Sequence, residues 1–377
     1  SSNTFSGINR ELIRFDYPGK IHGVQEIAFN PTVDPGDADY GNLYICLGDG
    51  SSGSKQLHDN LQTTSSFLGT IFRIDPQGNN SSNGQYGIPD DNPFYEGTGT
   101  GVVGEIYAYG FRNPHRISWD VAGTHKMLVG DIGEKNIEEI NLVEPGHNYG
   151  WNKREGTFLY DKSLNRDHVF SLPTDDATYQ YTYPVAQYDH DEGIAVVGGY
   201  VYRGTMLTSL NGQYVFGDIV NGKLFHVPEG DLLQGSQSTI SQLNLLNQSG
   251  SPTTLLEEVS HTRVDLRFGV GLNDELYILS KVDGIIRVLE SVDYVTATAN
   301  MKVSKFFPNP GKGTFKVLGE HGQLTIHVYN LSGALVASVD SFNASDDVLD
   351  LSHLPSGIYT FHLLQGTTST VQKVVLE

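Results

Sequence analysis

Short apolar runs alternate with turn-forming residues along most of the chain, and this pattern predicts an all-β protein. The runs are rich in β-branched and aromatic residues, and clusters of Gly, Asn, Asp or Pro separate them. We expect strands over residues 42–47, 70–74, 105–109, 199–202, 213–216, 223–227, 275–279 and 284–289. The best helix candidate is residues 232–246, but its Gln, Ser and Asn content favours a loop.

The strands recur in a loose pattern between residues 20 and 290. A strand that ends in a polar loop is followed by a second strand, and about four such units can be counted. This pattern is typical of the four-stranded blades of a β-propeller. The sequence therefore predicts a propeller over residues 1–294.

A second domain follows a linker of small residues at 291–300. Residues 324–339 alternate between apolar and polar positions around Ser332 and Gly333, which predicts a hairpin. Further alternating strands follow up to the last residue. We expect residues 295–377 to form a small β-sandwich with its own core.

Composition narrows the possible partners. The chain has 377 residues with 24 Lys and Arg against 44 Asp and Glu, a formal net charge of −20. This balance argues against binding to nucleic acid or to an anionic membrane surface. Cys46 is the only cysteine, so no intrachain disulfide forms, and no apolar run is long enough to span a membrane. No signal peptide is visible, which is compatible with removal of a leader before Ser1.

The C-terminal domain carries several motifs in a specific order. They are FPNP at 307–310, Gly313, VYNLSGALV at 328–336, DLSHLPSGIYTFHL at 350–363 and KVVLE at 373–377. In these motifs residues 304–377 resemble the type A sorting domain of the type IX secretion system of Bacteroidota. The resemblance implies that residues 301–377 engage the type IX machinery and that the protein is secreted or displayed at the cell surface. A generic Ig-like module for carbohydrate binding remains the alternative.

Five groups of segments stand out in the large domain. They are IHG at 21–23 with LGDG at 47–50, YGIPDDNPF at 86–94, EIYAYGFRNP at 105–114, the stretch from Gly130 to Trp151, and GGYVYRG at 198–204 with FGD at 216–218. Together they resemble the soluble glucose/sorbosone dehydrogenases, which are six-bladed propellers that use pyrroloquinoline quinone (PQQ) and calcium. GGYVYRG looks most like the sorbosone branch, which includes domains of the hedgehog-interacting type. The resemblance covers about residues 18–290 and implies oxidation of a sugar hydroxyl with hydride transfer to the quinone.

The resemblance assigns a catalytic group. His22 aligns with the family's base, and a neutral imidazole suits the removal of a hydroxyl proton near pH 7. Asp49 aligns with the acidic residue that would orient the ring. Arg112 would place a permanent cation over the quinone oxygens, with a hydrogen bond from Asn113. The alternatives are a loop histidine for His22, a turn former for Asp49 and a structural ion pair for Arg112.

Calcium sites are implied by the same alignment. The backbone carbonyls of Gly133 and Glu134 align with the ligands of the calcium that bridges to the cofactor. Glu139 and Tyr149 align with a second, structural calcium, and Glu138 stands beside them. Oxygen donors of these kinds are the ligands that calcium prefers. The alternative is a solvated acidic surface.

The match departs from the family in three places. The family has roughly two further blades before His22, so we expect either another chain or a missing N-terminal segment to complete the ring, since an open ring leaves strand edges unpaired. The family's cofactor-binding lysine falls near residues 218–222, whereas Lys223 comes just afterwards. Arg263 fits the family's arginine pair, but Arg267 fits only in a shifted register.

These departures leave a second class of function open. It is a non-catalytic, calcium-stabilised propeller that binds glycan or protein at the cell surface. A metal-dependent lactonase is a third option, but it needs several side chains that converge on one metal, and the sequence offers no such set. His190 precedes the GGYVYRG strand and could face the pocket or lie in a surface loop.

Overall fold

The structure is a computed structural model, and it describes residues 7, 9–50, 61–97, 100–290, 305–318, 323–330, 333–343, 347–365 and 368–377. The chain divides into two compact units, Ser1–Val292 and Asp293–Glu377.

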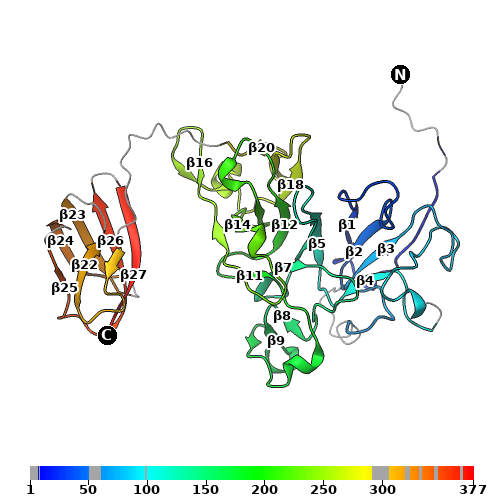
Figure 1. Ribbon diagram of the computed structural model, residues 1–377, viewed down its shortest axis with the longest axis horizontal. Coiled ribbons are helices and arrows are strands. Elements are labelled where there is room, and N and C mark those ends of the chain that lie inside the picture. The colour runs from blue at the N-terminus through cyan, green and yellow to red at the C-terminus, as the bar shows by residue number, and fades with distance from the viewer. Residues whose placement is uncertain are drawn as a thin grey trace. The chain divides into compact units, whose positions relative to one another are not determined.

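The larger unit consists of successive antiparallel sheets with the form of propeller blades (Figure 1). The first sheet contains β1 (Val24–Phe29), β2 (Leu43–Leu47), β3 (Thr70–Ile74) and β4 (Ile106–Tyr109) in that order. The second contains β5 (Pro114–Trp119), β6 (Met127–Asp131), β7 (Ile137–Leu142) and, at its edge, β11 (Ala186–Asp189). The third contains β12 (Val196–Val201), β13 (Gln213–Asp218), β14 (Leu224–Pro228) and β15 (Ser241–Gln242). The fourth contains β18 (Leu266–Val270), β19 (Leu276–Ser280) and β20 (Ile286–Val288).

Two insertions decorate the blades. Between β7 and β11 the chain forms β8 (Arg154–Glu155), β9 (Phe158–Tyr160), the short helix α1 (Lys162–Asn165), β10 (Val169–Phe170) and the 3-10 helix η3 (Asp176–Tyr179). Between the third and fourth blades lie β16 (Leu245–Leu246), β17 (Pro252–Thr253) and α2 (Leu255–Val259). Shorter 3-10 helices are η2 (Tyr95–Gly97), η4 (Thr208–Leu210) and η5 (Glu229–Asp231). The first insertion borders the candidate site described below.

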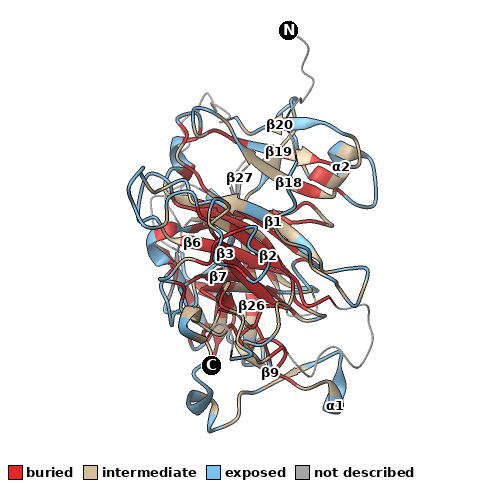
Figure 2. Cartoon of the chain, turned by 90° about the vertical axis from the view of Figure 1, so that its right-hand side faces the viewer, coloured by how far each residue is buried: buried red, intermediate tan, exposed pale blue. Residues whose placement is uncertain are grey.

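The core of the larger unit lies between neighbouring blades, and the central strands β3, β6 and β7 are buried along their whole length (Figure 2). Tyr44, Cys46, Ile117 and Val129 share one cluster between the first and second blades. A second cluster lies between the second and third blades and includes Leu128, Ile140, Val196 and Phe216. A third lies between the third and fourth blades and includes Val197, Leu224, Leu266 and Ile278. Among the described residues, no hydrophobic cluster joins the fourth blade to the first. Ile27 and Phe29 on β1, and Ile286 and Val288 on β20, are exposed.

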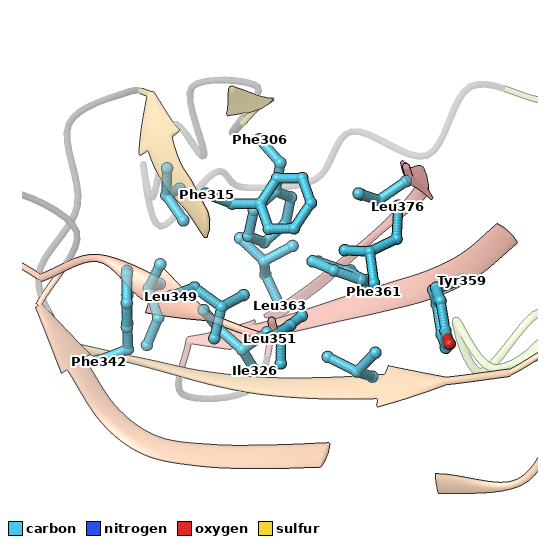
Figure 3. Packing of buried hydrophobic residues seen from close by; sticks show 14 residues of the cluster. Phe306, Phe315, Ile326, Phe342, Leu349, Leu351, Tyr359, Phe361, Leu363 and Leu376 are labelled. Carbon is cyan, nitrogen blue, oxygen red and sulfur yellow. The ribbon is translucent and has the colours of Figure 1, made fainter. Parts of the chain in front are cut away.

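The smaller unit is a β-sandwich. One sheet contains β21 (Lys305–Phe307), β22 (Thr314–Leu318) and β25 (Leu349–Asp350), and the other contains β24 (Leu335–Asn343), β23 (Gln323–Tyr329), β26 (Gly357–Gln365) and β27 (Thr368–Leu376). Figure 3 shows the core, where the Phe361 ring packs edge-on to Phe306 and Phe315, with centroid distances of 4.7 and 5.7 Å. Gly333 adopts a φ of 77° in the turn between β23 and β24, as the hairpin requires.

The strands confirm the all-β prediction and the blade prediction. Each of the eight predicted strands overlaps an observed one, and residues 232–246 contain no helix. The break between the two units falls close to the predicted boundary at residues 294 and 295.

Candidate functional site

The predicted site residues gather at one end of the blades because the strands are antiparallel. His22 precedes β1 and Asp49 follows β2, which runs in the opposite direction, so both lie at the same end. The loop with Arg112 joins β4 to β5, and the loop with Glu134 follows β6, again at that end. The polar ends of three strand connections therefore meet there.

His22 and Asp49 are in direct contact. The Nδ1 atom of His22 lies 2.7 Å from Asp49 Oδ1, and the indole Nε1 of Trp151 donates a 3.1 Å hydrogen bond to Asp49 Oδ2. Asp49 is almost completely buried, with 1% of its surface exposed. Gly48 makes this approach possible, because a Cβ at that position would lie 2.5 Å from the carbonyl oxygen of His22. Trp151, which the sequence analysis quoted but did not assign, completes a three-residue hydrogen-bonded chain.

Arg112 lies beside this chain and is held by Glu134. Its Nε and Nη2 donate to Glu134 Oε2 at 3.0 and 2.6 Å, and its Nη1 donates to the carbonyl oxygen of Ile132 at 3.0 Å. The guanidinium carbon is 5.7 Å from the centre of the Trp151 ring. Arg166 of the first insertion binds the other carboxylate oxygen of Glu134 at 2.5 Å. Burial favours a higher pKa for Glu134, but the two guanidinium groups outweigh it and hold the pKa below its ordinary value.

Asp131 organises the backbone of the same loop. Its carboxylate accepts hydrogen bonds from the backbone N–H groups of Arg112 at 2.9 Å and Asn113 at 2.6 Å. Across the sheet, Asp131 pairs in register with Glu139, and both are buried. Burial, reinforced by their mutual repulsion, raises the pKa of Glu139, and burial also raises that of Asp131. Two buried acids facing each other are a donor set that a cation would stabilise.

Glu138 and Glu139 point to opposite faces of β7. Glu138 contacts His190 Nε2 at 2.9 Å and accepts the N–H of Val196 at 2.8 Å, whereas Glu139 accepts the N–H of Gly156 at 2.6 Å. Since adjacent strand residues alternate between faces, their side chains do not converge on one ion. Burial raises the pKa of Glu138 to about 7, against the opposing effect of His190.

Tyr149 lies in the loop after β7 and is buried. Its hydroxyl donates to the carbonyl oxygen of Leu142 at 2.8 Å and accepts the N–H of Glu144 at 2.9 Å. Its hydroxyl is therefore occupied by backbone groups, and the structural calcium with which Tyr149 aligns stays a prediction. Among the described residues, no group of three or more His, Cys, Asp or Glu side chains is arranged to hold a metal ion. A cation here would need carbonyl and amide oxygens as well.

Glu155 is a further residue that the sequence analysis missed. Its Oε1 atom accepts four consecutive backbone N–H groups, those of residues 134, 135, 136 and 137, at 2.8, 2.9, 2.9 and 3.2 Å. Its Oε2 accepts the side-chain amide of Asn136 at 3.0 Å. One buried carboxylate thus fixes the loop that follows β6. No motif signals this role, because a carboxylate that binds backbone N–H groups needs no particular partner residue type.

Arg263 and Arg267 lie on the fourth blade. Arg263 is half exposed and pairs with Asp265 at 2.5 Å, while Arg267 donates to the carbonyl oxygen of Leu266 at 2.6 Å. Burial lowers the pKa of Arg267, and the neighbouring Arg116 lowers it further.

Residues 218–222 form a turn that is built around a buried carboxylate. Asp218 Oδ2 accepts the N–H groups of Ile194 and Ala195 at 2.6 and 2.7 Å, and Oδ1 accepts those of Val220 and Asn221 at 2.9 and 2.8 Å. Where the resemblance places a cofactor-binding lysine, the chain therefore has a loop anchor.

Comparison with known proteins identifies both units. Residues 19–250 match the family model described as glucose/sorbosone dehydrogenase, so the chain belongs to that family. Residues 305–377 match the secretion system C-terminal sorting domain. The predicted export is thereby confirmed, and the protein is delivered through type IX secretion to the cell surface or the surroundings.

Similar proteins span more than one branch of the family. The HIPL1 protein of Arabidopsis thaliana is 28% identical over 353 residues, which cover 86% of this chain and 48% of that protein. An aldose sugar dehydrogenase of Escherichia coli is 31% identical over 111 residues, 29% of this chain and 26% of that protein. The human hedgehog-interacting protein is 28% identical over 185 residues, 47% of this chain and 22% of that protein. The chain spans about half the length of HIPL1 and less of the others.

Among solved structures, the PQQ-bound form of an aldose sugar dehydrogenase from Streptomyces coelicolor is similar. It aligns with a TM-score of 0.43 and 22% identity over 74% of this chain and 61% of that chain. Within the described residues, no helix has the length and apolar character needed to cross a membrane.

Proposed function

We propose that the larger unit is the catalytic part of an exported sugar dehydrogenase, in which PQQ accepts a hydride and calcium supports the site. The observation that carries the proposal is the hydrogen-bonded chain from Trp151 through Asp49 to His22, with the Arg112 guanidinium beside it. Family membership supports the class of reaction. The sorting domain supports an extracellular site of action, reached through contact of residues 301–377 with the type IX machinery.

His22 acts as the general base in this proposal. In this role the His22 imidazole carries its proton on Nδ1 and donates it to Asp49 Oδ1. Its Nε2 then keeps a free lone pair. Nε2 would remove the proton of the sugar hydroxyl as a hydride leaves the carbon that bears this hydroxyl. The buried Asp49 carboxylate then stabilises the imidazolium, and the Trp151 indole prevents the carboxylate from rotating away.

Arg112 and Asn113 are the groups that would hold the quinone oxygens. Asn113 would donate to a quinone oxygen through its side-chain N–H group, since its Oδ1, which is buried and has no hydrogen-bond partner among the described residues, can only accept a hydrogen bond. The Arg112 guanidinium is partly buried and oriented by Glu134, which places a fixed positive charge where anionic oxygens would gather. PQQ, when bound, supplies the two-electron acceptor. Arg263 and Arg267 are the further cations that the family alignment assigns to it.

Calcium is the metal that the loop after β6 would hold. The carbonyl oxygens of Gly133 and Glu134 accept no hydrogen bond from the described residues, and the same is true of Tyr149. Asn141 Oδ1 is buried and has no hydrogen-bond partner in the described part of the chain, and the Asn141 side-chain N–H donates to Glu139. The carbonyl oxygens of Gly133 and Glu134 would serve the calcium that supports the cofactor, whereas Glu139 and its neighbouring amide would serve the second, structural calcium, whose charge would also relieve the repulsion between Asp131 and Glu139.

Dye-linked oxidation tests this function. The full chain is incubated with PQQ and Ca²⁺, and reduction of an artificial electron acceptor is followed with a panel of aldoses. We expect turnover with at least one sugar and a loss of about 100-fold or more in His22→Ala, the range typical of a missing general base. His22→Gln, which keeps the polarity and approximate size, is the matched variant. Turnover that is equal in all three proteins would overturn the role of His22.

The second candidate function is a calcium-stabilised propeller that binds without chemistry. The observation that favours it is the Arg112–Glu134 ion pair, which occupies the guanidinium that PQQ would need. A protein that fails to bind PQQ at saturating calcium, while calcium still raises its melting temperature, would support this function.

A further inference from the structure

Two tyrosines at the end of the first insertion form a stacked pair. The rings of Tyr179 and Tyr181 are parallel within 5°, and their centroids are 5.6 Å apart. Gln180 between them is exposed and has a φ of 54°, in the left-handed region. Tyr179 keeps 51% of its surface exposed. An exposed aromatic side chain thus lies next to an exposed amide.

A buried arginine fixes this pair from within. The guanidinium carbon of Arg154 is 4.9 Å from the centre of the Tyr181 ring and 5.6 Å from that of Tyr179. Arg154 Nε and Nη2 donate to Asp176 Oδ1 at 2.8 and 2.5 Å, and Nη1 donates to the carbonyl oxygen of Lys153 at 2.7 Å. The Tyr183 hydroxyl donates to the other oxygen of Asp176 at 2.5 Å. The rings are held before any ligand arrives, so a ligand would lose little free energy in ordering them.

The pair borders the candidate catalytic site. A Cβ added to Gly150 would lie 3.6 Å from Cγ of Tyr181, so the ring packs directly over that glycine. The next residue is Trp151, whose indole binds Asp49. The backbone N–H of Thr182 also donates to the carbonyl oxygen of Asn148 at 2.7 Å. The tyrosine pair is therefore attached to the loop that supports the His22 base.

We propose that Tyr179, Gln180 and Tyr181 form a carbohydrate-binding subsite that takes a neutral oligosaccharide next to the catalytic centre. The apolar C–H face of a pyranose ring would pack on the Tyr179 ring, and the Gln180 amide would exchange hydrogen bonds with its hydroxyls. Neutral glycans are favoured over anionic ones because the chain carries a net charge of −20 and Asp175 adjoins the pair. The ligand class rests on the proposed sugar-directed function, but binding at this subsite needs neither PQQ nor turnover.

Calorimetric titration of the full chain without PQQ tests the subsite. The probes are maltoheptaose, cellohexaose and chitohexaose as neutral glycans, and a hexamer of galacturonic acid as the anionic comparison. We expect at least one neutral probe to bind and Tyr179→Ala to weaken it by about tenfold, the size of one aromatic contact. Tyr179→Trp keeps an aromatic face and should bind at least as tightly as the parent.

Tyr40→Ala is the matched control, since Tyr40 is a similarly exposed tyrosine, 55%, in the loop between β1 and β2. It should bind like the parent and melt within about 1 °C of it. The proposal is overturned by a parent that binds no neutral probe, by equal affinities in the parent and Tyr179→Ala, or by tighter binding of the anionic hexamer. The titration contains no PQQ, so its result does not depend on whether the protein oxidises sugars in the dye-linked assay. Conversely, a variant that no longer binds the oligosaccharide should still oxidise monosaccharides.

Discussion

Replacement of Glu155 by Gln tests the claim that one buried carboxylate orders the loop after β6. The substitution keeps the shape of the side chain and removes its charge. In the parent, Oε1 accepts four backbone N–H groups and Oε2 accepts the Asn136 amide. In Glu155→Gln, the oxygen can still accept the backbone bonds, but its NH₂ group then faces the NH₂ of Asn136.

The expected loss follows from these contacts. A hydrogen bond to a charged acceptor contributes about 1 kcal/mol more than one to a neutral acceptor, so four of them give an upper limit of about 4 kcal/mol. Removing the charge also removes the cost of burying it, which offsets part of that loss. We therefore expect the free energy of unfolding to fall by about 2 kcal/mol. For a unit of this size, that corresponds to a decrease in melting temperature of about 4 °C.

Scanning calorimetry of the full chain measures the effect, with Glu96→Gln as the matched control. Glu96 is an exposed glutamate of η2, and its replacement should leave the melting temperature within about 1 °C of the parent. A Glu155→Gln protein that melts together with the parent and the control would refute the reasoning, because the carboxylate would then contribute no more than an amide.

Three further predictions concern other parts of the molecule. Burial lowers the pKa of His115 from 6.5 to about 3, with smaller effects from nearby arginines, so below pH 6.5 the unfolded chain binds a proton that the folded chain excludes. Urea unfolding at pH 7 and pH 5 should therefore show a fall in stability that is about 2 kcal/mol larger in the parent than in His115→Gln, and equal falls would contradict it. Calcium should raise the melting temperature of the parent and have a much smaller effect on Glu139→Gln; an equal rise in both proteins would exclude this carboxylate as a ligand. Phe361→Ala should cost the smaller unit about 3–5 kcal/mol and lower only its own melting transition, whereas a lowered transition of the larger unit would show that the two are not independent.

Sequence and structure agree best where periodicity carries the information. The alternation of apolar and polar residues is a direct record of which strand faces are buried, so the strands and the two units could be predicted. The same alternation also implies that Glu138 and Glu139 face opposite ways, so Glu138, which stands beside Glu139 in the sequence, points away from it in the fold. His22 and Asp49 were predicted from a family resemblance, and the structure places them in contact.

The residues that escaped prediction act through backbone groups or long-range contacts. Glu155 binds N–H groups that every residue except proline carries, so no spacing reveals it. Trp151 reaches Asp49 across 102 positions of the chain, a separation that local patterns do not encode. The stacking of Tyr179 and Tyr181 depends on the left-handed Gln180 and on Arg154, which only the folded chain brings together.

The most direct test of the central claim is a visible spectrum of the full chain reconstituted with PQQ and Ca²⁺, recorded before and after addition of one equivalent of aldose. Because a single turnover needs no external acceptor, it isolates the transfer of hydride from the sugar to the quinone. We predict that the spectrum of oxidised PQQ bleaches in the parent and persists in His22→Ala, which keeps the same amount of bound quinone. A parent that binds no PQQ at saturating calcium, or that binds PQQ and does not bleach with any aldose, would contradict the account.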